Sequence, residues 1–257
     1  MEAKDQTYLR VCEKFKTDGQ NLTLAILGDS HAKRLYAKVQ DEVENQEVQK
    51  FLLRATCAVG GARAGEFVES QSLMFNSLCS EDDISDIVII WIGGNDLDED
   101  LRNIDIQDKH AWNRHLHNRA LRGVLDLFVR LTKAGKIVYV IMLPERYSTR
   151  NVKLQASLQN TTTRVEVYRD SCKRFNSFLR RVLDTRVIVL PRRLNLNVKE
   201  AFEGVFHPYF GKEYVHLREQ HYTAMADVVL SYIKNDLDGK KSMPENFKLQ
   251  ELLNRYQ

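Results

Sequence analysis

The stretch DIVIIWIGGND, residues 86–96, is the most informative part of the sequence for the fold. Residues 86–92 form a short and almost wholly apolar run, and two glycines end it abruptly. A continuous apolar run of this length between turn signals is typical of a strand buried on both faces of a parallel sheet. The polar pair Asn95 and Asp96 follows at once, so we expect these side chains at the end of that strand.

The same pattern recurs on both sides of this stretch. Further strands are predicted at residues 22–27, 47–58, 136–143 and 186–190. Helices are predicted between and after them, at residues 31–45, 65–78, 109–133, 164–183 and 222–234. Short apolar strands that alternate with longer helices indicate an α/β fold, with a parallel sheet covered on both faces.

One domain accounts for most of the chain. We predict that it spans residues 21–236, with an N-terminal extension at residues 1–20. Residues 237–257 are predicted to be a polar linker and a short amphipathic helix, near residues 247–256. A length of 257 residues fits one large domain or two small ones, and no repeat divides it.

Composition excludes several classes of protein. There are 38 basic and 35 acidic residues, and the net charge of +3 is too small to indicate, by itself, nucleic acid or an anionic membrane as a partner. No apolar run is long enough for a transmembrane helix, and the N-terminus lacks the apolar segment of a signal peptide. The four cysteines, which show no CxxC spacing, suggest neither a zinc site nor a disulfide framework. We therefore expect a cytoplasmic protein without a metal.

Glycines gather where the predicted strands end. Of the 12 glycines, five stand at the ends of the first three strands: Gly28, Gly60, Gly61, Gly93 and Gly94. Parallel sheets bind ligands in the crevice beyond the carboxyl ends of their strands. No GxGxxG follows a strand and no GxxxxGK[ST] occurs, so a dinucleotide or P-loop site is not indicated.

Ser30 and Asn95 are candidates for chemistry at this edge. Ser30 follows a buried strand and opens a helix, so it is either a nucleophile or a helix N-cap. The Asn95 amide is placed to donate to an oxyanion, although an asparagine is also common in turns. Gly61 is either a second oxyanion donor, through its backbone N–H, or a turn glycine.

A serine nucleophile needs a general base. His216 lies in a late loop before the last predicted core helix, and Glu213 stands three residues earlier, where its carboxylate would orient the imidazole. His31 is too close to Ser30 in the chain to reach it easily. Three other histidines lie in a polar helical region and are expected to face solvent: His110, His115 and His117.

Taken together and in order, these segments resemble the SGNH (GDSL-like) hydrolase superfamily. The resemblance extends over about residues 22–235. Four blocks carry it: Gly28-Asp29-Ser30-His31, the glycine Gly61, Gly93-Gly94-Asn95-Asp96, and Glu213 to Leu217 around His216.

The resemblance implies a three-layer α/β/α sandwich with a five-stranded parallel sheet of flavodoxin-like type. It implies a serine esterase that acts through an acyl-serine intermediate, with Ser30 as nucleophile, His216 as base and Glu213 as the acid. The oxyanion hole would consist of the backbone N–H groups of Ser30 and Gly61 with the Asn95 side chain. No metal or other cofactor is implied, and the partner is an ester substrate.

The chain departs from the family pattern at three positions. Glu213 replaces the usual aspartate, so the site is either a triad with glutamate or a Ser-His dyad oriented by a backbone carbonyl. His221 stands where glycine is usual, and His31 replaces the leucine of the first block. The variant with histidine resembles esterase-like domains of animal genomes and mobile elements.

Two arginines near the strand ends are candidates for a substrate pocket. Arg63 follows the oxyanion glycine by two residues, and Arg146 follows the fourth predicted strand. Either is equally compatible with a structural or surface role. Two other functions remain open: an inactive binding module of the same fold, and a domain associated with nucleic acid.

Overall fold

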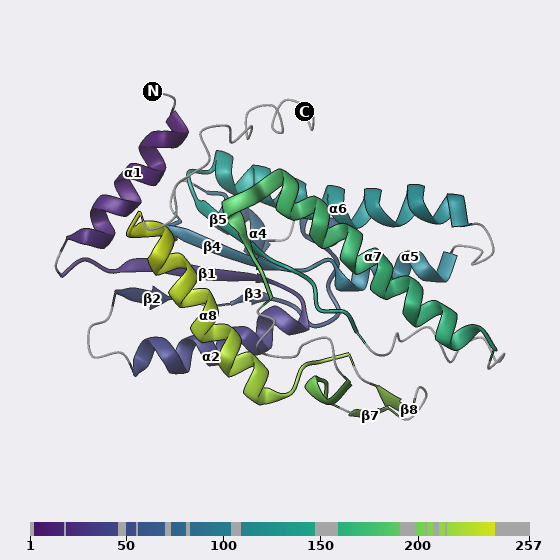
Figure 1. The fold of residues 1–257 in the computed structure, drawn as a ribbon. Helices are drawn as coiled ribbons and strands as arrows, with labels where there is room; N and C mark the ends of the chain where they lie inside the picture. Colours follow the sequence, from purple (N-terminus) through teal and green to yellow (C-terminus); the bar gives the residue numbers. More distant parts are fainter. Residues whose placement is uncertain are drawn as a thin grey trace.

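The structure of the chain is a computed structural model, shown in Figure 1. It describes residues 3–17, 19–45, 50–54, 56–69, 73–80, 83–103, 109–146, 159–190, 199–203, 205–207, 211–213 and 215–239. The amphipathic helix predicted near residues 247–256 lies outside these ranges.

A parallel sheet runs through the centre of the molecule (Figure 1). Its order is β2-β1-β4-β5-β6, and β3 pairs with β1 on the same side as β2. The strands are β1 (Leu22–Gly28), β2 (Phe51–Leu53), β3 (Cys57–Ala58), β4 (Ile87–Trp91), β5 (Ile137–Ile141) and β6 (Val187–Ile188). The single strand predicted at residues 47–58 is therefore two short strands, and the five predicted strand positions hold six strands.

The central strands are buried because their sequences are apolar throughout. Every residue of β1, β4 and β5 is buried. This burial on both faces is what a continuous apolar run requires, because side chains alternate between the two faces of a strand. The predicted α/β fold with a parallel sheet is confirmed.

The helices divide into two groups with the sheet between them (Figure 1). Helix α2 packs on α8, and α1 also contacts α8, whereas α6 contacts α3, α5 and α7. The helices are α1 (Ala3–Lys16), α2 (Ser30–Glu44), α3 (Ala64–Glu69), α4 (Leu73–Leu78), α5 (Gly94–Asn103), α6 (Lys109–Lys133), α7 (Gln159–Leu183) and α8 (Glu219–Leu237). Among the described residues, no helix is long and apolar enough to cross a membrane.

Three elements differ from the sequence prediction. The helix predicted at residues 65–78 is two short helices, α3 and α4. Helix α5 begins at Gly94, where no helix was predicted. A small hairpin of β7 (Val205–His207) and β8 (Gly211–Glu213) precedes α8, where a loop was expected.

Helix α1 packs on the predicted domain, although it belongs to the N-terminal extension. Its Val11 side chain is fully buried, and the Tyr8 hydroxyl donates to the Asp236 carbonyl at 2.8 Å. The Arg186 guanidinium lies 4.9 Å from the Tyr8 ring centroid and donates to the Asp236 carboxylate at 3.3 Å. The same carboxylate accepts the Tyr139 hydroxyl at 2.6 Å. Asp236 of α8 is thus tied to α1 through its backbone carbonyl, and to β5 through its buried carboxylate.

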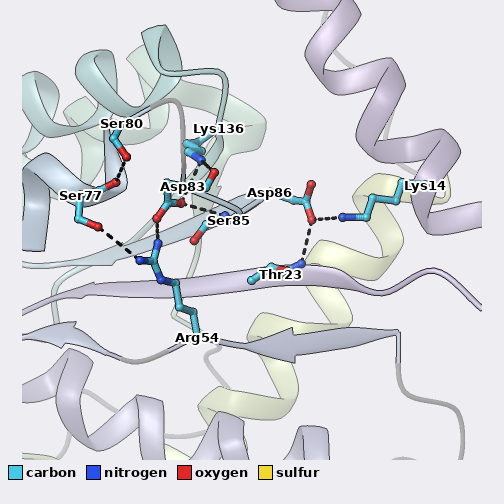
Figure 2. A network of polar contacts seen from close by, with 9 residues as sticks. All are labelled: Lys14, Thr23, Arg54, Ser77, Ser80, Asp83, Ser85, Asp86 and Lys136. Atoms are coloured by element: carbon cyan, nitrogen blue, oxygen red, sulfur yellow. Dashed lines mark hydrogen bonds and ion pairs between the residues drawn. The ribbon is translucent and has the colours of Figure 1, made fainter.

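A polar network closes the amino ends of the strands (Figure 2). The buried Asp83 carboxylate accepts the Lys136 ammonium at 3.0 Å and also pairs with Arg54. Asp86, directly before β4, pairs with Lys14 of α1 at 2.7 Å. The charges of this network pair with one another, which offsets the cost of burying them. This edge of the sheet is therefore structural.

The opposite edge is shaped by the close approach of β1 and β4. Gly28 is the register partner of Trp91, and a Cβ atom on Gly28 would stand 2.1 Å from the Trp91 carbonyl oxygen. The Asp29 N–H donates to that same oxygen at 3.2 Å. Only glycine permits this approach, which places the segment after β1 directly beside the segment after β4.

We predict that Gly28→Ala destabilises the protein by about 3 kcal/mol or more, because the clash is with backbone that cannot rotate away. Chemical denaturation measures the free energy of unfolding. Gly60→Ala is the matched control, because a Cβ there meets nothing within 4 Å, and it should change stability by less than about 0.5 kcal/mol. Equal stabilities of the two variants would contradict the prediction.

Candidate active site

Ser30 stands at the carboxyl edge of the sheet as the first residue of α2. The N-cap of this helix is Asp29, whose carboxylate accepts the His31 N–H at 2.9 Å. The Ser30 hydroxyl is therefore not the N-cap, which was the structural alternative to its role as a nucleophile. As a residue of the first helical turn, Ser30 has a backbone N–H without an intrahelical partner, and the helix dipole there favours an anion.

His216 meets Ser30 across the fold. Its Nε2 atom lies 2.8 Å from the Ser30 Oγ atom, although the two residues are 186 positions apart. The backbone around His216 is held by pairing with an earlier segment: the Glu203 N–H donates to the His216 carbonyl at 2.7 Å, and the Arg218 N–H donates to Ala201 at 2.8 Å. The predicted nucleophile and base are thus brought within hydrogen-bond distance.

A buried hydrogen-bond chain supports this pair from behind. The Tyr222 hydroxyl, on α8, lies 2.8 Å from Nδ1 of His31 and accepts the Leu217 N–H at 3.3 Å. Because Tyr222 accepts from a backbone N–H, its own proton is free to go to His31, whose Nδ1 is then the acceptor. The chain connects the residue after Ser30 to the residue after His216.

His31 is uncharged in this environment. Its side chain is buried, and its ring centroid lies 5.4 Å from that of His216 and 5.2 Å from that of Trp91. Desolvation holds the pKa of His31 well below its usual range, and the charges of Arg146, His216 and Arg34 lower it further. His31 therefore acts as a neutral hydrogen-bond partner.

Two of the candidate oxyanion donors, Asn95 in the first turn of α5 and Gly61 in the turn after β3, belong to neighbouring segments. The Asn95 Nδ2 atom donates to the Ala62 carbonyl at 3.0 Å, which fixes the amide beside the turn that contains Gly61. Gly61 has a φ of +80°, a conformation that favours glycine. The Asp96 carboxylate accepts the Ala64 N–H with both oxygens, at 3.1 and 3.0 Å. The motif after β4 is thereby attached to the loop after β3.

The two arginines that are candidates for a substrate pocket differ in their surroundings. Arg146, predicted to line the pocket, is 1% exposed and donates from Nη2 to the Asn95 Oδ1 atom at 3.3 Å. It lies beneath the site because Gly94 leaves room for its guanidinium. Arg63 is partly exposed directly before α3, where it binds the carboxylate of Glu66 in that helix at 2.7 Å.

Other predicted residues are placed only in part. Glu213 is the last residue of β8, but its side chain lies outside the described residues, as do those of His110, His115 and His117. His221 lies in the first turn of α8. Among the described residues, no group of three or more His, Cys, Asp or Glu side chains is arranged to hold a metal ion.

Two residues of the site were missed by sequence reasoning. Tyr222 was assigned only to a core helix. Asp29 was noted only as part of the Gly28-Asp29-Ser30-His31 motif. Asp29 could have been identified, because an aspartate directly before a helix is a common N-cap. Tyr222 carries no comparable signal, since its partners are 191 and five positions away.

Comparison with solved structures shows similar folds. A lipase from a goat rumen metagenome has a TM-score of 0.54 at 14% identity, over 82% of this chain and 97% of the lipase. An extracellular lipase from Streptomyces rimosus has a TM-score of 0.51 at 15% identity, over 82% of this chain and 99% of the lipase. No family profile matches the chain, and no curated protein matches its sequence. The likeness to these lipases is therefore one of fold, and it agrees with the predicted α/β architecture.

We predict that His31 makes the protein less stable in acid. The pKa of His31 is lower in the folded than in the unfolded chain. Below about pH 6.5, the imidazole therefore takes up a proton in the unfolded chain but not in the folded one, and this protonation stabilises the unfolded chain. Stability is thus lost as pH falls from about 6.5 toward the folded pKa, by up to about 1.4 kcal/mol per pH unit. In His31→Gln, which does not titrate, this part of the loss should be absent.

Urea denaturation of both proteins between pH 7.5 and 5 measures the difference. The unfolding free energy of His31→Gln should fall less steeply than that of the wild type. His31→Leu serves as a second variant, because it also removes the titration but leaves Tyr222 without its acceptor. Curves that stay parallel for all three proteins would show that His31 does not titrate on unfolding.

Proposed function

We propose that this protein is a serine esterase that hydrolyses carboxylic esters through an acyl-serine intermediate. The observation that carries the proposal is the 2.8 Å contact between Ser30 Oγ and His216 Nε2 at the carboxyl edge of a parallel sheet. The fold is shared with proteins described as lipases, which act on esters. Fold alone does not define activity, so the proposal depends on the site.

In the acylation step, Ser30 Oγ attacks the carbonyl carbon of the ester while His216 Nε2 takes the hydroxyl proton. The carbonyl π electrons move to oxygen, which becomes an oxyanion. When the tetrahedral intermediate collapses, the bond to the alcohol breaks and His216 returns the proton to the departing oxygen. The products of this half-reaction are an alcohol and the acyl-serine.

The oxyanion would be held by donors that are fixed before the substrate arrives. Asn95 uses one Nδ2 hydrogen for the Ala62 carbonyl and has a second for the oxyanion. The backbone N–H groups of Ser30 and Gly61 are the other two proposed donors. Fixed donors of this kind stabilise the transition state without reorganising during the reaction.

Deacylation reverses the roles. His216 removes a proton from water, the resulting hydroxide attacks the acyl carbon, and the proton passes to Ser30 as the carboxylic acid leaves. For His216 to accept at Nε2, its Nδ1 must carry the other proton. We propose Glu213 as the acceptor of that N–H, with a backbone carbonyl as the alternative in a dyad. The Glu213→Gln variant discriminates the two, since a dyad would keep its activity.

A binding module of the same fold is the competing function. It is motivated by the departures at Glu213, His221 and His31. Such a module would retain the fold without a reactive Ser30, so it would neither release alcohol from an ester nor react with a fluorophosphonate. Retention of nucleic acid on a filter at about 0.15 M salt would point to the nucleic-acid-associated form of this alternative, because such binding is largely electrostatic.

We predict that Ser30→Ala and His216→Ala each lower kcat for p-nitrophenyl acetate by at least about 10⁴-fold, because each removes a group that makes or breaks a bond. Both variants should also lose labelling by a fluorophosphonate. Ser177→Ala, at an exposed serine of α7, is the matched control and should behave as the wild type. Equal rates for wild type and Ser30→Ala would refute the proposal.

We predict that Asn95→Ala lowers kcat by about 10²–10³-fold with little change in KM, as expected when one oxyanion donor is removed. Steady-state kinetics with the same ester measure both constants. Asn76→Ala, at an exposed asparagine of α4, is the control. A rise in KM at constant kcat would instead indicate that Asn95 binds the substrate in its ground state.

A further inference from the structure

Arg146 is a buried cation directly beneath the candidate oxyanion hole. It follows β5 and is 1% exposed. Its guanidinium carbon lies 5.5 Å from the ring centroid of Tyr168, and its Nη1 atom lies 4.0 Å from the Asp98 carboxylate. An arginine keeps its charge when buried, so a full positive charge lies in the protein interior next to Asn95.

The hydrogen bonding of this cation is directed at one residue. Nη2 of Arg146 donates to the Asn95 Oδ1 atom at 3.3 Å. Within the described part of the chain, its Nε and Nη1 atoms have no hydrogen-bond partner. A buried arginine that served only to neutralise a carboxylate would form two parallel hydrogen bonds with it. The arrangement therefore indicates that the main partner of Arg146 is the Asn95 amide and not the Asp98 carboxylate.

The Asn95 amide is held at both ends. Its oxygen accepts from Arg146, and its nitrogen donates to the Ala62 carbonyl at 3.0 Å. These two contacts settle which end of the amide is nitrogen and leave one Nδ2 hydrogen for another acceptor. A cationic donor on the oxygen also draws electron density from the nitrogen, which strengthens the remaining N–H as a donor.

Gly94 makes the approach of Arg146 possible. A Cβ atom at this position would stand 2.7 Å from Nη2 of Arg146, closer than real contacts allow. The second glycine of the Gly93-Gly94-Asn95-Asp96 motif is thus explained by the arginine behind it. From the sequence, Gly94 was placed only at the end of a predicted strand.

We propose that Arg146 is a positioning residue that orients the Asn95 amide and strengthens it as an oxyanion donor. The expected effect of Arg146 on kcat rests on the proposed function. The orientation of the Asn95 amide does not, because its hydrogen bonds exist whether or not an ester is bound. Burial opposes the charged form of Arg146, but Tyr168, Asp98 and Asp29 together raise its pKa, so the guanidinium stays protonated at all working pH values.

The kinetic test compares Arg146→Met, Asn95→Ala and the double variant on p-nitrophenyl acetate. Arg146→Met should lower kcat by about 10- to 100-fold with KM nearly unchanged, the loss expected for one hydrogen bond from a charged group. The double variant should be no slower than Asn95→Ala, because Arg146 acts through that amide. Losses that multiply in the double variant would overturn the proposal.

Arg186→Met is the matched control, since Arg186 is also buried, lies over a tyrosine ring and pairs with the Asp236 carboxylate. It should lower the melting temperature but not kcat. An equal loss of kcat in both methionine variants would show that Arg146 is merely structural. If Arg146→Met does not fold, Arg146→Lys, which keeps the charge without the planar fork, should retain an intermediate kcat.

A measurement independent of activity separates this inference from the proposed function. The side-chain amide of Asn95 is observed by ¹H–¹⁵N NMR in the wild type and in Arg146→Met. Loss of Arg146 should shift the Nδ2 proton resonances upfield and speed their exchange with water. An unchanged amide would overturn the inference even in an active esterase. A changed amide in a wild type that hydrolyses no ester would refute only the proposed function.

Discussion

The parallel pairing of β1 with β4 is the constraint on which the rest of the site depends. Its register sets Gly28 beside Trp91, so closely that no side chain fits at Gly28. Two segments that are far apart in the sequence therefore leave the sheet at the same point, one toward Ser30 and the other toward Asn95. Helices α2 and α5 both begin there, at Ser30 and Gly94, so each segment is fixed by the first turn of a helix.

Each proposed catalytic side chain is supported by a buried polar group that takes no direct part in the proposed reaction. Tyr222 and His31 connect the backbone beside His216 to the backbone beside Ser30. Arg146 lies behind Asn95 in the same way. Buried polar groups lower stability unless they are satisfied, so their presence here favours a role in fixing geometry. The amino edge of the sheet differs, because its charges pair with one another (Figure 2).

This arrangement explains why a histidine stands at position 31, where the resembled family has leucine. A leucine at this position would pack in the core but would offer Tyr222 no acceptor. With histidine, the Tyr222 hydroxyl has partners on both sides, which fixes the loop that carries His216. The departure at His221 lies inside α8, so it alters the start of a helix and not the contact between His216 and Ser30.

The sequence by itself determined the α/β fold, the alternation of its main strands and helices, and the residues that stand at the strand ends. These follow from local patterns, because apolar runs define buried strands, and glycines or prolines end them. Only the tertiary structure decided which of these residues meet. The contact of Ser30 with His216 spans 186 positions, and the burial of Arg146 depends on Gly94 and Asp98 of α5 converging with Tyr168 of α7. Such convergence leaves no periodic trace in the sequence, because it arises from packing between distant segments.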